Sequence, residues 1–132
     1  GWHDQGVSDV KSWHVYFRPY CFKNDAHGRA VVLSEFGGYN RRLAGHSYSA
    51  RDFGYKRYRS DEALAEAVER LYQKEILPAI PLGLSATVYT QLSDVEEETN
   101  GLLTYDRAAQ KLPAERIRAI NASLYAALQG KA

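Results

Sequence analysis

The residue best placed to do chemistry in this chain is Glu35, which follows an apolar run and precedes two glycines. Residues 30–38 read Ala-Val-Val-Leu-Ser-Glu-Phe-Gly-Gly, and this beginning is typical of a buried parallel strand. Glutamate is depleted in strands and costly to bury without a partner. At the carboxyl end of such a strand it indicates an active site in a barrel or a doubly wound sheet. A solvated strand end, or an ion pair with a lysine or arginine, explains the pattern equally well.

Two further candidates lie in the apolar and aromatic run Val10–Tyr16, which we expect to be a strand. His14 and Tyr16 are two residues apart, so in a strand their side chains point to the same face. One interpretation makes His14 an ordinary hydrogen-bonded histidine of the core. The other places His14 and Tyr16 beside Glu35, at the ends of neighbouring strands.

Metal and cofactor chemistry has little support in the sequence. The four histidines and the single cysteine, Cys21, do not have the spacing of a metal site. Asp94 and the glutamates at 96–98 leave three interpretations open: a cation site, a polar rim or a solvated turn. The sequence contains no glycine-rich phosphate loop and no serine elbow. We therefore expect no metal and no cofactor.

Three strands are expected to position the candidate residues, at 10–16, 30–36 and 86–92. Helical patterns lie between the second and third strands and after the third. Alternation of strands with helices predicts an α/β fold with parallel strands. Three strands are too few to close a barrel, so we expect the chain to be part of a larger domain.

Both helices have recognisable ends. Ser60 is a suitable N-cap for the first helix, and Pro78 and Pro81 are expected to end it and lead into the third strand. Pro113 suits the first turn of the second helix, and Gly130 its end. The apolar residues at helical spacing are Leu64, Val68, Leu71, Tyr72 and Ile76 in the first helix, and Ile117, Ile120, Leu124 and Leu128 in the second.

Composition excludes several classes of partner. The 132 residues carry a formal net charge of +1, which argues against binding to nucleic acid or to an acidic membrane surface. The long loop Gly37–Arg59 is rich in arginine and tyrosine and could follow a phosphate backbone, but near-neutrality favours a solvated active-site loop. No apolar run is long enough to span a membrane. A lone cysteine implies no oxidising compartment, so a cytoplasmic location is the default expectation.

Three segments resemble the catalytic barrel of glycoside hydrolase family two, which includes β-galactosidases, β-glucuronidases and β-mannosidases. They are Ser34–Gly38, Val88–Glu96 and Glu98–Arg107, the last reading Glu-Thr-Asn-Gly-Leu-Leu-Thr-Tyr-Asp-Arg. The resemblance extends over nearly the whole chain. It implies that residues 1–132 are one partial domain, the C-terminal segment of a (β/α)8 TIM barrel with strands six to eight and helices seven and eight.

The same resemblance implies a role for each candidate residue. Glu35 matches the catalytic nucleophile of a retaining exo-β-glycosidase. Tyr16 matches a tyrosine that orients the nucleophile, and His14 lies near the sugar site by the same alignment. Tyr89 stands where several members carry a tryptophan that contacts the sugar. The implied substrate is a carbohydrate.

One essential part of the family site has no match. The acid/base glutamate of the family follows an asparagine on strand four, and the sequence contains no Asn-Glu pair. A retaining enzyme needs this second carboxyl group about 5–5.5 Å from the nucleophile. We therefore expect the chain alone to be inactive, and to pair with the remainder of a barrel or self-associate through exposed strand edges. The alternative is a non-catalytic carbohydrate-binding or scaffold domain derived from the same barrel.

Overall fold

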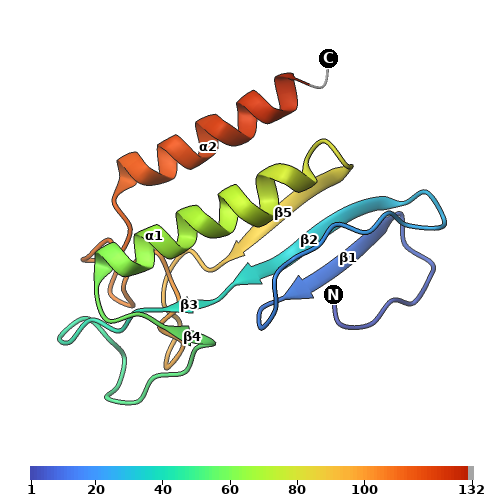
Figure 1. Ribbon diagram of the computed structural model, residues 1–132. Helices are drawn as coiled ribbons and strands as arrows, with labels where there is room; N and C mark the ends of the chain where they lie inside the picture. The colour runs from blue at the N-terminus through green and yellow to red at the C-terminus, as the bar shows by residue number, and fades with distance from the viewer. Residues whose placement is uncertain (131–132) are drawn as a thin grey trace.

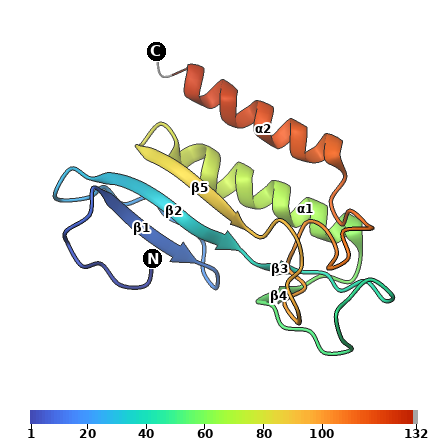
Figure 2. The same cartoon turned by 180° about the vertical axis from the view of Figure 1, so that it is seen from behind.

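The computed structural model describes residues 1–130 and shows an α/β arrangement with one parallel sheet. The sheet contains β1 (Val10–Val15), β2 (Ala30–Gly37) and β5 (Leu84–Thr90), in the spatial order β1-β2-β5. All three strands run the same way, and both helices lie on one side of the sheet (Figures 1 and 2). The predicted α/β fold is confirmed at this level. The predicted domain ends at residue 132, and residues 131–132 lie outside the described residues.

The first helix, α1 (Asp61–Leu71), begins as predicted, because the Ser60 side chain accepts a hydrogen bond from the backbone N–H of Ala63. After α1 the helical path continues through a π-helical turn, Tyr72–Ile76, and a short 3₁₀ turn, Leu77–Ala79. It therefore ends between Pro78 and Pro81, as predicted from these two prolines. Pro78 is tolerated there because it lies in the first two positions of the 3₁₀ turn, where a backbone N–H needs no helical partner.

Strand β5 begins and ends two residues before the predicted range of 86–92. Leu84 follows Gly83, whose φ of 126° is accessible to glycine. The side chain of Leu84 is buried in the core. The burial of Leu84 therefore fixes the start of the strand. Within the predicted loop, Tyr39–Asn40 (β3) and Lys56–Arg57 (β4) form a short parallel pair beyond the end of β2 (Figure 1). Strands of two residues are too short for a periodic signal.

The second helix, α2 (Ala114–Gln129), follows Pro113 and ends at Gly130. Pro113 is the residue before the helix, with an extended ψ of 135°, and does not belong to its first turn. No residue of α2 is fully buried; Ile117, Ile120 and Leu124 pack only partly against the core. The helix is also tied to α1 by Arg116, whose guanidinium pairs with carboxylates of that helix.

The apolar core lies between the sheet and α1 and consists of two clusters of buried side chains. The larger joins the three strands to the end of the first helical segment, and the smaller joins α1 to the segment before α2. The larger cluster contains Val15, Tyr20, Leu33, Phe36, Leu71, Ile76, Ala79 and Leu84; the smaller contains Leu64, Ala65, Val68 and Leu112.

The opposite face of the sheet carries the candidate site. Within residues 1–130 neither helix covers this face, and Ala86 and Val88 are exposed on it. Strands β1 and β5 each pair only with β2 in the described chain, so each has one free edge. Such edges present unpaired backbone groups to a further strand.

Candidate functional site

A β-bulge in β2 aims the side chain of Glu35. Trp13 of β1 lies opposite Leu33, but the next residue, His14, lies opposite Glu35, so Ser34 is the extra residue of the bulge. Side chains of a regular strand alternate between faces, and Glu35 would then share the core-facing side with Leu33. Because of the bulge, Phe36 takes the core position and Glu35 points to the open face.

The carboxylate of Glu35 lies where the three strands of the sheet end. The hydroxyl of Tyr16 donates a hydrogen bond to Oε2 of Glu35 at 2.6 Å. The same hydroxyl lies 3.1 Å from Oγ1 of Thr90, the last residue of β5. Nδ1 of His14 lies 3.2 Å from the same Oε2. The structure therefore brings together three of the four predicted site residues, Glu35, Tyr16 and His14.

The environment of Glu35 leaves it accessible. Its side chain is 43% exposed, and within residues 1–130 no lysine or arginine forms an ion pair with it. Both contacts described above are made to Oε2, and Oε1 has no hydrogen bond in this part of the chain. The two structural explanations for Glu35 were an ion pair with a lysine or arginine and a fully solvated strand end. Within residues 1–130 the ion pair is absent, and the side chain is only partly solvated.

Tyr16 and His14 differ in how their polar atoms are satisfied. Burial, and then the hydrogen bond to Glu35, raise the pKa of Tyr16, so its hydroxyl stays protonated and remains a donor. Nδ1 of His14 is buried but has no hydrogen bond with proper geometry among the described residues. A protonated imidazole would turn the short approach to Glu35 into an ion pair.

The two glycines after Glu35 are needed for the approach of two tyrosines. Gly37 and Gly38 have φ values of 90° and 64°, which side-chain-bearing residues rarely adopt. A Cβ on Gly37 would collide with the ring of Tyr89, and a Cβ on Gly38 with the ring of Tyr55. Tyr55 therefore reaches across the backbone to stack on Tyr16, with ring centroids 4.2 Å apart.

Further aromatic rings surround this stack. The ring of Trp2 lies edge-on to His14 at 5.3 Å. Phe17 and Phe53 lie edge-on to Tyr55 at 5.0 and 5.8 Å, with 77% and 55% of their surfaces exposed. Sequence reasoning placed aromatic residues in this loop but gave Tyr55 no role. The glycine pair was the available signal, because it shows that a bulky group approaches the backbone.

Tyr89 is not brought to the site. It lies opposite Phe36 in the β2–β5 register, so its side chain is on the core-facing side of the sheet. There it packs against Phe36 at 5.6 Å and Tyr72 at 6.4 Å, and burial raises the pKa of its hydroxyl. The predicted contact with the sugar has no support in this position. The next residue, Thr90, reaches the site in its place.

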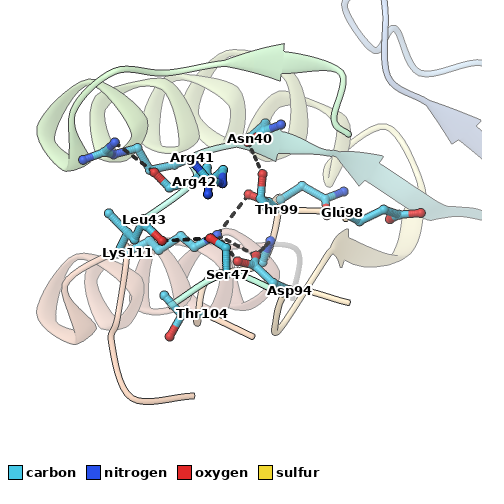
Figure 3. Close-up of polar contacts among 12 residues, drawn as sticks. Asn40, Arg41, Arg42, Leu43, Ser47, Asp94, Glu98, Thr99, Thr104 and Lys111 are labelled. Atoms are coloured by element: carbon cyan, nitrogen blue, oxygen red, sulfur yellow. Dashed lines mark hydrogen bonds and ion pairs between the residues drawn. The ribbon is translucent and has the colours of Figure 1, made fainter. Parts of the chain in front are cut away.

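The acidic segment after β5 builds a buried polar network around Lys111 (Figure 3). The ammonium group of Lys111 donates to Oδ1 and Oδ2 of Asp94 at 2.5 and 2.7 Å, and to the carbonyl of Thr99 at 3.0 Å. Asp94 also accepts the backbone N–H of Gly101 at 2.8 Å, and Thr99 donates to Asn40. This network links the segment after β5 to β3.

Burial acts against both charges of this network. The side chains of Asp94 and Lys111 are fully buried, and this raises the pKa of Asp94 and lowers the pKa of Lys111, while their mutual contact opposes both shifts. Because both oxygens of Asp94 bind Lys111, they are not available to a cation. Among residues 1–130 no group of three or more His, Cys, Asp or Glu side chains is arranged to hold a metal ion.

Comparison with known proteins adds no assignment. No protein-family model matches the chain, and no curated protein matches it. Within residues 1–130 no helix has the length and apolar character needed to cross a membrane. The geometry around Glu35 is therefore the basis for a functional assignment.

Proposed function

We propose that the chain is the C-terminal segment of the (β/α)8 catalytic barrel of a retaining exo-β-glycosidase, and that Glu35 is its nucleophile. The observation that supports this most strongly is the pair formed by Glu35 and Tyr16. A carboxylate at the carboxyl end of a central parallel strand has one oxygen held by a hydroxyl donor and the other open. The oxygen without a protein partner is therefore accessible to another molecule.

The chemistry follows from this arrangement. Oε1 of Glu35 attacks the anomeric carbon of a β-glycoside, the bond to the leaving group breaks, and a glycosyl ester forms. Water then attacks the same carbon, the ester bond breaks, and the configuration is retained. Tyr16 holds Oε2 and thereby fixes the direction of Oε1. Its raised pKa keeps the donor proton in place throughout.

The proton for the leaving group must come from a second carboxyl group. Glu98 lies on the segment after β5, and its Oε2 accepts a hydrogen bond from Gln91 at 3.4 Å. It has no counterpart in the family as a proton donor. We therefore assign the acid/base group to a part of the barrel outside this chain, and the free edges of β1 and β5 to pairing with its other strands.

The proposal is tested by removing the nucleophile from the complete barrel protein. Glu35→Gly should lower kcat on nitrophenyl β-glycosides at least about 1,000-fold. Azide should restore turnover and give a glycosyl azide of inverted configuration, because azide occupies the space of the missing carboxylate. Glu66→Gln, on the exposed side of α1, should retain activity.

Two results would contradict the proposal. One is full activity in the Glu35→Gly protein. The other is turnover by the isolated chain that depends on Glu35, since the second carboxyl group would then have to lie within these residues.

The alternative, carbohydrate binding without catalysis, is favoured by the exposed rings of Phe17 and Phe53 beside the site. Aromatic faces next to polar groups suit sugar binding. In that case the complete protein would bind a monosaccharide with an affinity that drops in Phe53→Ala. It would show no hydrolysis in either the original or the Glu35→Gly form.

A further inference from the structure

A second concave site lies away from Glu35, beside the β3–β4 pair and the beginning of α1. It is a pocket of about 530 Å³. Four arginines contribute to its wall, together with two polar side chains and one acid: Arg41, Arg42, Arg57, Arg59, Asn40, Tyr58 and Asp52. Arginine is suited to recognising oxyanions, because its planar group presents several fixed N–H donors.

Carboxylates compensate only part of this positive charge. Arg41 pairs with Asp61 at 2.9 Å, and Arg57 approaches Asp52 at 3.4 Å. Arg42, which is half-buried, has a backbone carbonyl of residue 49 as its hydrogen-bond partner, at 3.2 Å. Arg59 has no hydrogen bond or ion pair within residues 1–130. Two guanidinium groups of one pocket therefore have no carboxylate partner in the described chain.

The backbone of Arg41 is joined to the buried network described above. Figure 3 shows Arg41 and Arg42 following Asn40, which accepts a hydrogen bond from Thr99. The backbone N–H of Arg41 also donates to the carbonyl of Thr99 at 3.0 Å. The wall of the pocket at Asn40 and Arg41 is thus fixed by buried contacts.

We propose that this pocket binds one doubly charged tetrahedral oxyanion, a phosphate monoester carried by a small molecule or a glycan. Two uncompensated guanidinium groups match its two negative charges. The four arginines line one pocket, and the whole chain carries only +1, so a polyanion is a poor fit. This inference is independent of the role of Glu35.

The test is titration of the complete protein with sodium sulfate and, separately, sodium phosphate at constant ionic strength, followed by calorimetry and by NMR of the arginine Nε–H groups. We expect saturable binding of phosphate, with shifts at Arg42 and Arg59. Arg42→Gln and Arg59→Gln should each weaken binding about tenfold, as for the loss of one charged hydrogen bond. Arg118→Gln, on the exposed face of α2, is the matched control and should bind like the original.

The two anions and a third probe identify the chemistry. Phosphate binding as tight as sulfate binding, or tighter, supports a phosphate monoester, and sulfate binding clearly tighter than phosphate binding would overturn it; acetate should bind at least about tenfold more weakly than phosphate. Acetate binding as tight as phosphate, an equal loss in Arg118→Gln, or no saturable binding would overturn the proposal. If Arg42→Gln fails to fold, Arg42→Lys combined with Arg59→Gln must still weaken binding.

Discussion

Two acids lie near the carboxyl ends of strands of the same sheet, and they differ in burial and in the number of their hydrogen-bond partners. Asp94, after β5, is fully buried, with its two oxygens bound by Lys111 and by the backbone of Gly101. Glu35, near the end of β2, is 43% exposed and has contacts on one oxygen only. The first carboxylate is saturated, and the second has an oxygen free.

This difference is the one expected between an acid that stabilises the fold and the nucleophile we propose. A saturated, buried carboxylate holds chain segments together but cannot reach another molecule. A carboxylate with one fixed and one free oxygen is oriented and still available for bond formation. Both acids lie near a strand end, so position does not distinguish them. The number of hydrogen-bond and ion-pair partners on their carboxylate oxygens does.

The largest expected effect on stability comes from breaking the buried Asp94–Lys111 ion pair. Lys111→Met leaves Asp94 buried without a countercharge, and this should lower the free energy of unfolding by about 3–5 kcal/mol. Urea unfolding measures it, with Lys74→Met on the exposed side of the helical segment as control. If the two variants lost similar stability, the network around Lys111 would not be structural.

The next largest effect on stability is expected at Gly38. Gly38→Ala combines a positive φ with a collision against the Tyr55 ring, and we expect a loss of about 2–3 kcal/mol in the free energy of unfolding. Gly45 has a similar φ of 83° but open space around it, so Gly45→Ala should lose only about 1 kcal/mol. If Gly38→Ala and Gly45→Ala lost the same free energy of unfolding, the close contact between the Tyr55 ring and the backbone at Gly38 would not matter for stability.

Tyr16→Phe removes the hydroxyl donor to Glu35 while keeping the stack with Tyr55. The stability loss should be about 1 kcal/mol, because the carboxylate can be solvated in its place. In the complete barrel protein kcat should fall about 10- to 100-fold, as expected for the loss of a positioning contact. Tyr48→Phe, in the exposed loop, should change neither quantity. An unchanged kcat in Tyr16→Phe would show that the orientation of Glu35 does not matter.

The smallest effect on stability is expected at Glu35, the proposed nucleophile. Glu35→Gln preserves shape and can still accept the Tyr16 hydrogen bond, so the free energy of unfolding should change by less than about 0.5 kcal/mol. The comparison with Lys111→Met is the sharpest test of the contrast between the two acids. A loss of several kcal/mol in Glu35→Gln would place Glu35 among the structural residues.

The sequence was sufficient to predict the parallel strands and the Ser60 cap, because these depend on local patterns: an apolar run and a capping side chain. It placed His14 and Tyr16 beside Glu35 at neighbouring strand ends as one of two interpretations, and the structure shows that grouping. The placement of Tyr89 was wrong because the β2–β5 register puts it opposite Phe36, and register is a tertiary property.

The Asp94–Lys111 pair was missed for a related reason. Its members are 17 residues apart, on segments with no regular structure, and no periodicity connects them. The bulge at Ser34 had no recognised signal either. It decides which face Glu35 occupies, so the orientation of the central residue came from the structure alone.

The most direct measurement is covalent trapping with 2-deoxy-2-fluoro-β-glycosyl fluorides of galactose, glucuronate and mannose in the complete barrel protein. The fluorine slows both steps, and the fluoride leaving group needs no proton donor, so the glycosyl ester accumulates. Mass spectrometry of the digested protein should find the added sugar on the peptide that contains Glu35, and none in Glu35→Gln. A label on another acid, or hydrolysis of β-glycosides with no label at Glu35, would contradict its role as nucleophile.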